Sequence, residues 1–503
     1  MFWSVPQERV SFIRVKKILA GEEVFGWEEQ NKSHIFGCLR QNKSLKGSTE
    51  MVQVKLPEET NYVFDRAPAG RLPLIDRGEG IYLFDSLGKR YIDGSSGALI
   101  SNIGHAMEVV TEAVVEQMRK IEFVHGTQFT SESIKGLAKK IAQMTPGNLN
   151  KVYFVSGGSE AIETAIKMAR GYHVIRGDVQ KYKIISRWHS YHGATLGALS
   201  LSGRPALRKL YAPMLFDFPH IVPAYCYRCP YNKDSENCQI DCAKDLERVV
   251  TLEGPEYIAA FIAEPVVGAT IGAVPAPEGY FKVIREICDR YGILFIADEV
   301  MTSFGRTGKS FGMDHWGVVP DLLVGSKGLG AGYFPIGIVI ASEGIYNTYK
   351  DGPGKFNHGF TYQGNPLAGA VGSSVLEFIE KNNLIRHVEE TGKYLIEGLS
   401  QLKNYRMVGD VRGKGFMTAF ELVRDKETKA PFDPSLNVNS KIINRAFSKG
   451  LILYPSGNTG NADGVSGNAV LVAPPLITTR EQITEILNIL EETLKELDKE
   501  LFD

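Results

Sequence analysis

The sequence predicts an α/β fold with a large, mostly parallel sheet and a smaller α+β domain. Between about residues 151 and 327, short apolar runs rich in β-branched residues alternate with helical segments, which is typical of a parallel sheet. Beyond residue 375 helices and strands follow in a mixed order, which is typical of an α+β domain. The chain has 503 residues, more than one hydrophobic core usually supports, so two domains are expected.

The composition excludes several classes of protein. It is 43% hydrophobic and 23% charged, as in soluble globular proteins, and the formal net charge of -1 argues against a large nucleic-acid-binding surface. The apolar stretches are interrupted well short of about 18 residues, so no transmembrane helix is expected. Six cysteines in so long a chain do not suggest a secreted disulfide scaffold. We therefore expect a cytoplasmic protein that binds neither nucleic acid nor membrane.

The N-terminal 50 residues have no clear periodicity. They lack the apolar region of a signal peptide, and the acidic residues around Glu22 and Glu28 argue against a transit peptide. Residues 1–50 are either an extension of unknown role, or the physiological start is Met51.

Residues 51–104 are expected to join the small domain. Two alternating strands, Ile81–Asp85 and Arg90–Asp93, flank a turn that contains Gly88, which predicts a hairpin. The large domain is predicted over 105–375, starting with helices at 106–121 and 131–144, and the small domain over 376–503.

A glycine-rich turn opens the alternating region. Strand Lys151–Val155 leads through Gly157 and Gly158 into a helix over Glu160–Tyr172. Backbone N–H groups at such a helix N-terminus can cradle a phosphate group. Taken alone, this signal is weak, since many tight strand-to-helix turns bind nothing.

Polar residues follow the next apolar runs, which are predicted strands at 183–187, 257–263, 293–297 and 321–324, with a crossover helix at 278–291. Tyr191 and His192 come after the first run, Glu264 after the second, Asp298 after the third and Lys327 after the fourth. In open α/β sheets, ligands bind at the carboxyl ends of the strands. A carboxylate and a lysine placed there suit pyridoxal phosphate (PLP), because the amine can bind the cofactor covalently and the acid can keep the pyridine nitrogen protonated. Read singly, Tyr191 is an ordinary aromatic and Glu264 a solvated strand cap.

Four cysteines lie in a polar excursion over 225–243: Cys226, Cys229, Cys238 and Cys242. Their spacing suits a tetrahedral thiolate site for zinc or an iron–sulfur cluster. Such a site would be structural, because four thiolates leave zinc no open position. The alternative is a loop of unliganded thiols, or one held by a local disulfide.

The C-terminal part is predicted to contain helices at 368–380, 384–402, 439–448 and 480–501, and strands at 407–413, 415–422, 451–454 and 469–472. Residues 456–468 are rich in Gly, Asn and Asp and are expected to form a loop.

Several motifs occur in the order that is found in one family: SGGSEAIETAIKMAR, YHG, IAEP, FIADEV, GSKG, HGFTYQGNPLAGA and VRGKG. Each is weak alone, but together they are specific. Over roughly residues 55–500 the chain resembles the class III (ω-amino acid) aminotransferases of the PLP-dependent fold-type I group. The resemblance implies a seven-stranded large-domain sheet and a homodimer with shared active sites.

The resemblance also implies roles for the residues named above. Lys327 would hold PLP covalently and Asp298 would pair with its pyridine nitrogen. The remaining cofactor contacts would come from the ring-stacking and phosphate-binding positions Gly158, Ser159, Tyr191, His192, Val300 and, from the neighbouring subunit, Thr361. Glu264 and Arg412 would form a gate in which the glutamate masks or frees the arginine for substrate carboxylates; the alternative is a permanent structural pair between them.

The implied reaction is a ping-pong transfer of an amino group. An ω-amino acid or amine would be the donor, and a 2-oxo acid, pyruvate or 2-oxoglutarate, the acceptor. Alternatives on the same fold are an aminomutase, a decarboxylase or a racemase. A non-enzymatic PLP-fold binding protein is disfavoured, because both Lys327 and Asp298 are present.

Three positions depart from the patterns of relatives. Ala194 stands where the 4-aminobutyrate enzymes carry a substrate-binding arginine, which makes that substrate less favoured. Val267 stands where many relatives have a glutamine, and Tyr454 where some amine:pyruvate enzymes have a mobile arginine. These positions argue against some substrates without naming one.

Overall fold

The computed structural model describes residues 62–67, 72–234, 236–457 and 468–503. The chain divides into two compact units, Met1–Leu72 and Pro73–Asp503, and the described helices and strands all belong to the second unit. The predicted extension 1–50, the alternative start at Met51 and most of the predicted loop 456–468 lie outside the described residues. Within the described ranges, no helix is both long enough and apolar enough to cross a bilayer.

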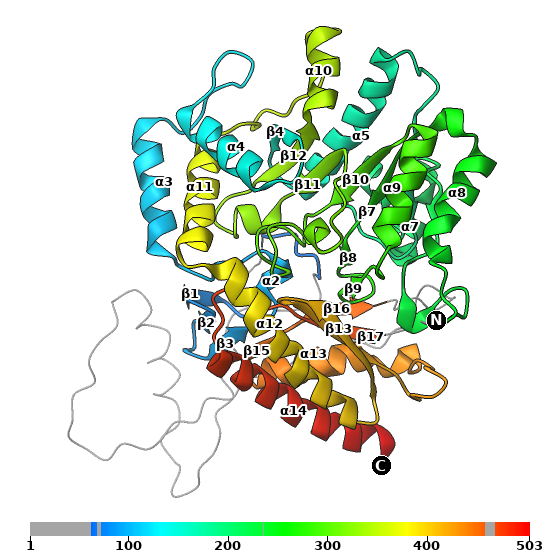
Figure 1. Cartoon of the computed structure of the whole chain (residues 1–503). Helices are drawn as coiled ribbons and strands as arrows, with labels where there is room; N and C mark the ends of the chain where they lie inside the picture. Colours follow the sequence, from blue (N-terminus) through cyan, green and yellow to red (C-terminus); the bar gives the residue numbers. More distant parts are fainter. Residues whose placement is uncertain (1–61, 68–71, 235, 458–467) are drawn as a thin grey trace, which may run out of the picture. The chain divides into compact units, whose positions relative to one another are not determined.

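The large sheet has seven strands in the order β4-β12-β11-β10-β7-β5-β6 (Figure 1). Its described strands are β4 (Leu149–Val155), β5 (Lys183–Arg187), β6 (His220–Ile221), β7 (Ile258–Ala263), β10 (Leu294–Asp298), β11 (Leu322–Gly325) and β12 (Gly337–Ser342). Only β12 runs antiparallel to its neighbours β11 and β4. The prediction of a mostly parallel seven-stranded sheet is therefore confirmed.

The sheet is buried on both faces, which explains why its strands read as unbroken apolar runs. Ile296 and its neighbours on one face pack against helix α5 (Gly158–Ile175). Phe295 on the other face packs in the cluster that contains α8 (Asp241–Glu253) and α9 (Tyr280–Tyr291). Because side chains alternate along a strand, Asp298 lies on the α5 face of β10.

Seven further α-helices are described before residue 382. They are α2 (Ser96–Leu99), α3 (Glu108–Lys120), α4 (Glu132–Met144), α6 (Leu196–Leu201), α7 (Pro205–Tyr211), α10 (Glu343–Asp351) and α11 (Pro366–Lys381). Helix α11 packs against α3 and α4. The predicted domain boundary after residue 375 falls inside α11, so the division of the chain into a large and a small domain stays a prediction.

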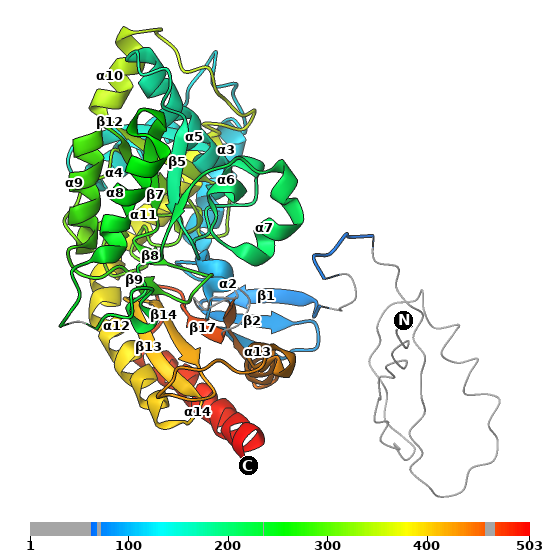
Figure 2. The same ribbon diagram turned by 90° about the vertical axis from the view of Figure 1, so that its right-hand side faces the viewer.

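The other described sheets are two of four strands and the two-stranded sheet of β8 (Val266–Val267) and β9 (Val274–Pro275), and three further α-helices lie beyond residue 382. One sheet joins β1 (Ile75–Glu79), β2 (Tyr82–Asp85), β3 (Arg90–Asp93) and β15 (Leu451–Ile452); the other joins β13 (Val408–Lys414), β14 (Met417–Leu422), β17 (Asn468–Val472) and β16 (Tyr454–Gly457). Helices α12 (Leu384–Gln401), α13 (Val438–Ser448) and α14 (Arg480–Phe502) lie together at one end of the unit (Figures 1 and 2).

The predicted strand over 451–454 is divided between these two sheets. Leu451 pairs with Ile92 of β3, whereas Tyr454 pairs with Leu471 of β17. A single apolar run does not reveal that its halves have different partners.

Candidate active site

A cavity of about 180 Å³ opens at the carboxyl ends of the strands β5, β7, β10 and β11. It is lined by Gly158, Ser159, Tyr191, His192, Gly193, Glu264, Val266, Asp298, Val300, Met301, Ser326 and Lys327. The fold thus brings together all the predicted site residues except Thr361, Arg412 and the cysteines.

Asp298 and Lys327 reach this cavity from neighbouring strands. Asp298 is the last residue of β10, lies opposite Val324 of β11 and is only 4% exposed. Lys327 comes two residues after the last residue of β11 and has φ 37°, a left-handed conformation that a side-chain-bearing residue rarely adopts. Such strain is concentrated at functional positions.

Burial sets the protonation of the lysine. Desolvation lowers the pKa of Lys327 to about 8, although the nearby carboxylates of Asp298 and Glu264 act in the opposite direction. A larger share of the amine is therefore neutral, and nucleophilic, near neutral pH than for a lysine in water.

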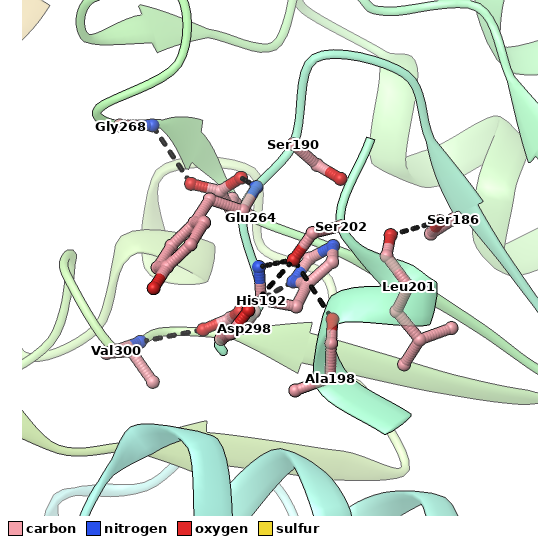
Figure 3. Close-up of polar contacts among 12 residues, drawn as sticks. Ser186, Ser190, His192, Ala198, Leu201, Ser202, Glu264, Gly268, Asp298 and Val300 are labelled. Atoms are coloured by element: carbon pink, nitrogen blue, oxygen red, sulfur yellow. Dashed lines mark hydrogen bonds and ion pairs between the residues drawn. The ribbon is translucent and has the colours of Figure 1, made fainter. Parts of the chain in front are cut away.

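Hydrogen bonds hold the carboxylate of Asp298 in one orientation (Figure 3). One oxygen contacts Nδ1 of His192 at 2.6 Å, and the other accepts the backbone N–H of Val300 at 3.1 Å. The backbone N–H of His192 donates in turn to the hydroxyl of Ser202 at 2.8 Å. His192 therefore fixes the orientation of the Asp298 carboxylate.

The first turn of α5 forms one wall of the cavity. The N–H groups of a first helical turn have no acceptor within the helix, so Gly158 and Ser159 suit an anion. A side chain at Gly158 would come within 3.1 Å of Val300 Cγ1. The space at Gly193 (φ 139°) is even smaller, since a Cβ there would lie 2.6 Å from the hydroxyl oxygen of Ser159.

Glu264 is a structural acceptor at the edge of this cavity. It is 4% exposed, so the interpretation as a solvated strand cap is wrong. Its carboxylate accepts the backbone N–H groups of Tyr191 at 3.0 Å and of Gly268 at 2.9 Å (Figure 3). Burial raises its pKa, with His192 acting in the opposite direction.

Glu264 and Arg412 are not paired with each other in this structure, and the predicted gate, in which the glutamate masks or frees the arginine, stays a prediction. Arg412 on β13 forms ion pairs with Asp410 at 2.8 Å and with Glu421 at 2.7 Å. The hairpin of β8 (Val266–Val267) and β9 (Val274–Pro275) engages both predicted partners: its Gly268 N–H binds Glu264, and its Ile271 and Gly272 carbonyls accept from Arg412.

Several buried charged residues were not predicted from the sequence, among them Glu421, Arg306 and Glu299. Glu421 on β14 and Arg306 are both fully buried, and Glu299 accepts the N–H groups that begin the turn at residue 312. Arg306 donates to the carbonyls of Phe416 and Pro474 and to the side chains of Ser96 and Asn102. A charged residue inside an apolar run, as in MTAFEL, was the available signal.

The four cysteines of the excursion line one cavity of about 540 Å³. All four are free thiols, so the alternative of a local disulfide is not realised. Among the described residues, no group of three or more His, Cys, Asp or Glu side chains is arranged to hold a metal ion. The arrangement therefore does not support the prediction of zinc or an iron–sulfur cluster.

Thr361 is exposed and does not line the cavity. Its predicted contact with the neighbouring subunit's cofactor stays a prediction.

Comparison with known proteins identifies the family. The sequence pattern of the Aminotransferase class-III family matches residues 66–494. The chain belongs to this family. It is a class III aminotransferase of fold type I, as the motifs predicted, and this family uses PLP.

Individual class III aminotransferases resemble the chain over nearly its whole length. It is 39% identical to the uncharacterized aminotransferase YodT of Bacillus subtilis, over 88% of this chain and 99% of that protein. It is 35% identical to the putrescine–pyruvate aminotransferase of Pseudomonas aeruginosa, over 87% and 93%. A PMP-bound aminotransferase structure from Vibrio fluvialis superposes with a TM-score of 0.81 at 31% identity, over 88% and 97%.

Proposed function

We propose that this aminotransferase binds PLP in the cavity around Lys327 and moves an amino group from an amine or ω-amino acid to a 2-oxo acid, pyruvate or 2-oxoglutarate, by a ping-pong mechanism. One observation carries the proposal: a lysine with a lowered pKa shares a cavity with an oriented carboxylate and a helix N-terminus. The resemblance to the putrescine–pyruvate enzyme supports an amine donor and pyruvate.

The residues that line the cavity fit the cofactor. The first turn of α5, at Gly158 and Ser159, would hold its phosphate group, and Asp298 would hold a protonated pyridine nitrogen. Tyr191 and Val300 would contact the two faces of its ring. When bound, PLP supplies an electron sink that stabilises negative charge on the substrate carbon next to nitrogen.

Residues of the protein would move the substrate proton and stabilise the charge on the cofactor. The amine of Lys327 would take the proton from that substrate carbon, as a base, and would then donate it, as an acid, to the cofactor carbon on the other side of the substrate nitrogen. The carboxylate of Asp298 is oriented by His192 and by the backbone N–H of Val300, and it would form an ion pair with the protonated pyridine nitrogen. Burial of Asp298, which is 4% exposed, would limit the access of water to this carboxylate.

We further propose that the active enzyme is a homodimer. An exposed Thr361 has no role in the cavity of its own chain, which agrees with a phosphate contact across a subunit interface. Sedimentation analysis of wild type should give a dimer, and Thr361→Val should weaken cofactor retention by about tenfold without dissociating the dimer. Full activity of a monomer would contradict the shared site.

The proposed reaction is tested with the purified holoenzyme and a panel of amines and ω-amino acids. A productive donor should bleach the cofactor's visible absorbance, and a 2-oxo acid should restore it. Equal amounts of carbonyl product and new amino acid identify transamination. Release of carbon dioxide, or a rearranged amine without a 2-oxo acid, would instead identify a decarboxylase or an aminomutase.

A further inference from the structure

Arg306 is a fully buried arginine that connects distant segments of the chain. It lies in the long connection between β10 and β11, and its side chain is 0% exposed. Its Nη1 donates to the carbonyl of Phe416 at 3.2 Å and to that of Pro474 at 2.5 Å. Its Nη2 donates to the hydroxyl of Ser96 at 3.1 Å and to Oδ1 of Asn102 at 2.7 Å. All four acceptors are neutral groups, so hydrogen bonds rather than an ion pair hold this guanidinium.

The positive charge of Arg306 is not compensated by a contacting carboxylate in the described part of the chain. Asp93 interacts with it electrostatically, but the Asp93 carboxylate contacts Nε2 of His105 at 3.0 Å and accepts the backbone N–H groups of Ser95 and Gly97. Burial lowers the pKa of Arg306 to about 9, with Asp93 acting in the opposite direction, so the guanidinium is still charged at neutral pH. Because little water screens a buried charge, its effect on neighbouring groups is larger than that of a surface charge.

Asn102 connects Arg306 to the turn that carries Lys327. The amide oxygen of Asn102 accepts from Arg306, and its Nδ2 donates to the carbonyl of Phe304 at 3.4 Å. Gly328, the residue after Lys327, packs against this amide so closely that a Cβ at Gly328 would lie 2.1 Å from Nδ2. Asn102 is 1% exposed. The strained backbone at Lys327 is therefore followed by a contact with a side chain that Arg306 holds in place.

The charged groups that act on the amine of Lys327 are two carboxylates and one guanidinium. The carboxylates of Asp298 and Glu264 favour the protonated amine. Arg306 favours the neutral amine and therefore acts in the same direction as burial. It does this from outside the cavity, since its side chain is not among the residues that line it.

We propose that Arg306 is a positioning residue for Lys327: through Asn102 it fixes the turn that carries the lysine, and its positive charge favours the neutral amine. The neutral amine is the form that binds the cofactor and accepts the substrate proton. The inference rests on the proposed function, because the charge of Lys327 matters to the reaction only if this amine is the proton-transfer group. It adds to that function a residue that touches neither cofactor nor substrate.

Two substitutions separate the charge of Arg306 from its hydrogen bonds. Arg306→Gln removes the charge, whereas Arg306→Lys keeps it but cannot form all four hydrogen bonds of the guanidinium. Acetic anhydride reacts with the neutral amine of Lys327 in the full-length apoenzyme, and peptide mass spectrometry gives the rate relative to the exposed Lys135. At pH 7 this rate should fall about fivefold in Arg306→Gln and change less than about twofold in Arg306→Lys.

Asn102→Asp tests the same effect without changing the arginine. It keeps the shape of the side chain and its acceptor for Nη2 of Arg306, but it compensates the positive charge, so the acetylation of Lys327 at pH 7 should again fall. Asn439→Asp is the matched control, because Asn439 on α13 also donates its amide to a backbone carbonyl, that of Ser456 at 2.7 Å. This variant should leave the acetylation rate of Lys327 unchanged.

A wild-type acetylation rate in Arg306→Gln would overturn the proposal. Equal falls in Arg306→Gln and Arg306→Lys would do the same, because they would make Arg306 a structural residue only. Should circular dichroism show that the arginine variants do not fold, an unchanged rate in Asn102→Asp is equally contrary.

The acetylation assay involves no turnover, so it separates this inference from the proposed function. If wild type transaminates and the acetylation rate is the same in Arg306→Gln, the role of Arg306 fails while the proposed function stands. If the rate falls as expected but wild type transfers no amino group, the proposed function fails and the effect of Arg306 on Lys327 stands.

Discussion

Two buried polar regions of this aminotransferase are organised in different ways. Around Lys327, desolvation outweighs the nearby carboxylates, and the pKa of the amine falls to about 8. Around Glu421, the charges of two arginines, Arg228 and Arg412, and of two carboxylates balance. Desolvation acts to lower the pKa of Arg412, but nearby acidic groups, the carboxylates of Glu421 and Asp410 among them, outweigh it, so this pKa rises. The first arrangement favours proton transfer, whereas the second favours fixed charges that position other groups.

The largest expected effect is a loss of activity on substitution of Lys327, the proposed proton-transfer group of the first region. Lys327→Ala should lower kcat by about 10³-fold to 10⁴-fold, because it removes the base that moves the substrate proton. Steady-state assays check this, with Lys309→Ala as control, since Lys309 is an exposed partner of Glu389. A Lys327→Ala enzyme with full turnover would refute the proposed mechanism.

The next effect is on the oriented carboxylate. Asp298→Asn keeps the shape of the side chain but cannot carry its negative charge, so kcat should fall by about 10²-fold to 10³-fold. Cofactor content should stay near one per chain, because the α5 first turn and Lys327 are intact. Asp289→Asn, on the exposed side of α9, should behave as wild type. Equal activities of the two variants would show that Asp298 is only structural.

In the second region, the expected effect is on stability. Glu421→Gln leaves Arg228 and Arg412 without their shared anion and should reduce the free energy of unfolding by about 3 kcal/mol. Denaturant unfolding measures this, and Asp298→Asn should cost clearly less. If the two variants were equally destabilised, the contrast between the regions would not hold.

The smallest expected effect is on pH dependence. Because the pKa of Lys327 is lowered, its neutral form, which reacts with PLP, should appear as pH rises through about 8. The rate of PLP capture by apoenzyme should rise about tenfold from pH 7 to 9 and then level off. A rate that still climbs steeply above pH 10 would indicate an unperturbed lysine.

Much of the fold and of the cofactor site was predictable from the sequence, for a local reason. Strands buried on both faces read as apolar runs, and Asp298, Glu264 and Lys327 each come within a few residues of such a run. Family membership, fold type and the seven-stranded sheet are confirmed. The turns at Gly158 and Gly193 could also be predicted from their glycines. Neighbouring atoms lie so close to these two positions that a side chain would not fit there without displacing them.

Contacts between distant segments were not predictable. Glu421 meets Tyr225 and Arg228 across almost two hundred residues, and nothing local in either segment indicates the other. The partners of Arg412 in this structure, Asp410 and Glu421, were not predicted for the same reason. The β8–β9 hairpin forms hydrogen bonds with both Glu264 and Arg412. Its strands have only two residues each, which is too short to show a periodicity in the sequence.

The pairing of β3 with β15 has a consequence for biosynthesis. Ile92 lies near the beginning of the compact unit and Leu451 near its end, so this sheet closes only after almost the whole chain has been made. Until then the N-terminal hairpin presents an unpaired edge strand, which favours association with other chains. A chain shortened before residue 451 would keep that edge permanently open, so late truncations should yield aggregates rather than a smaller working enzyme.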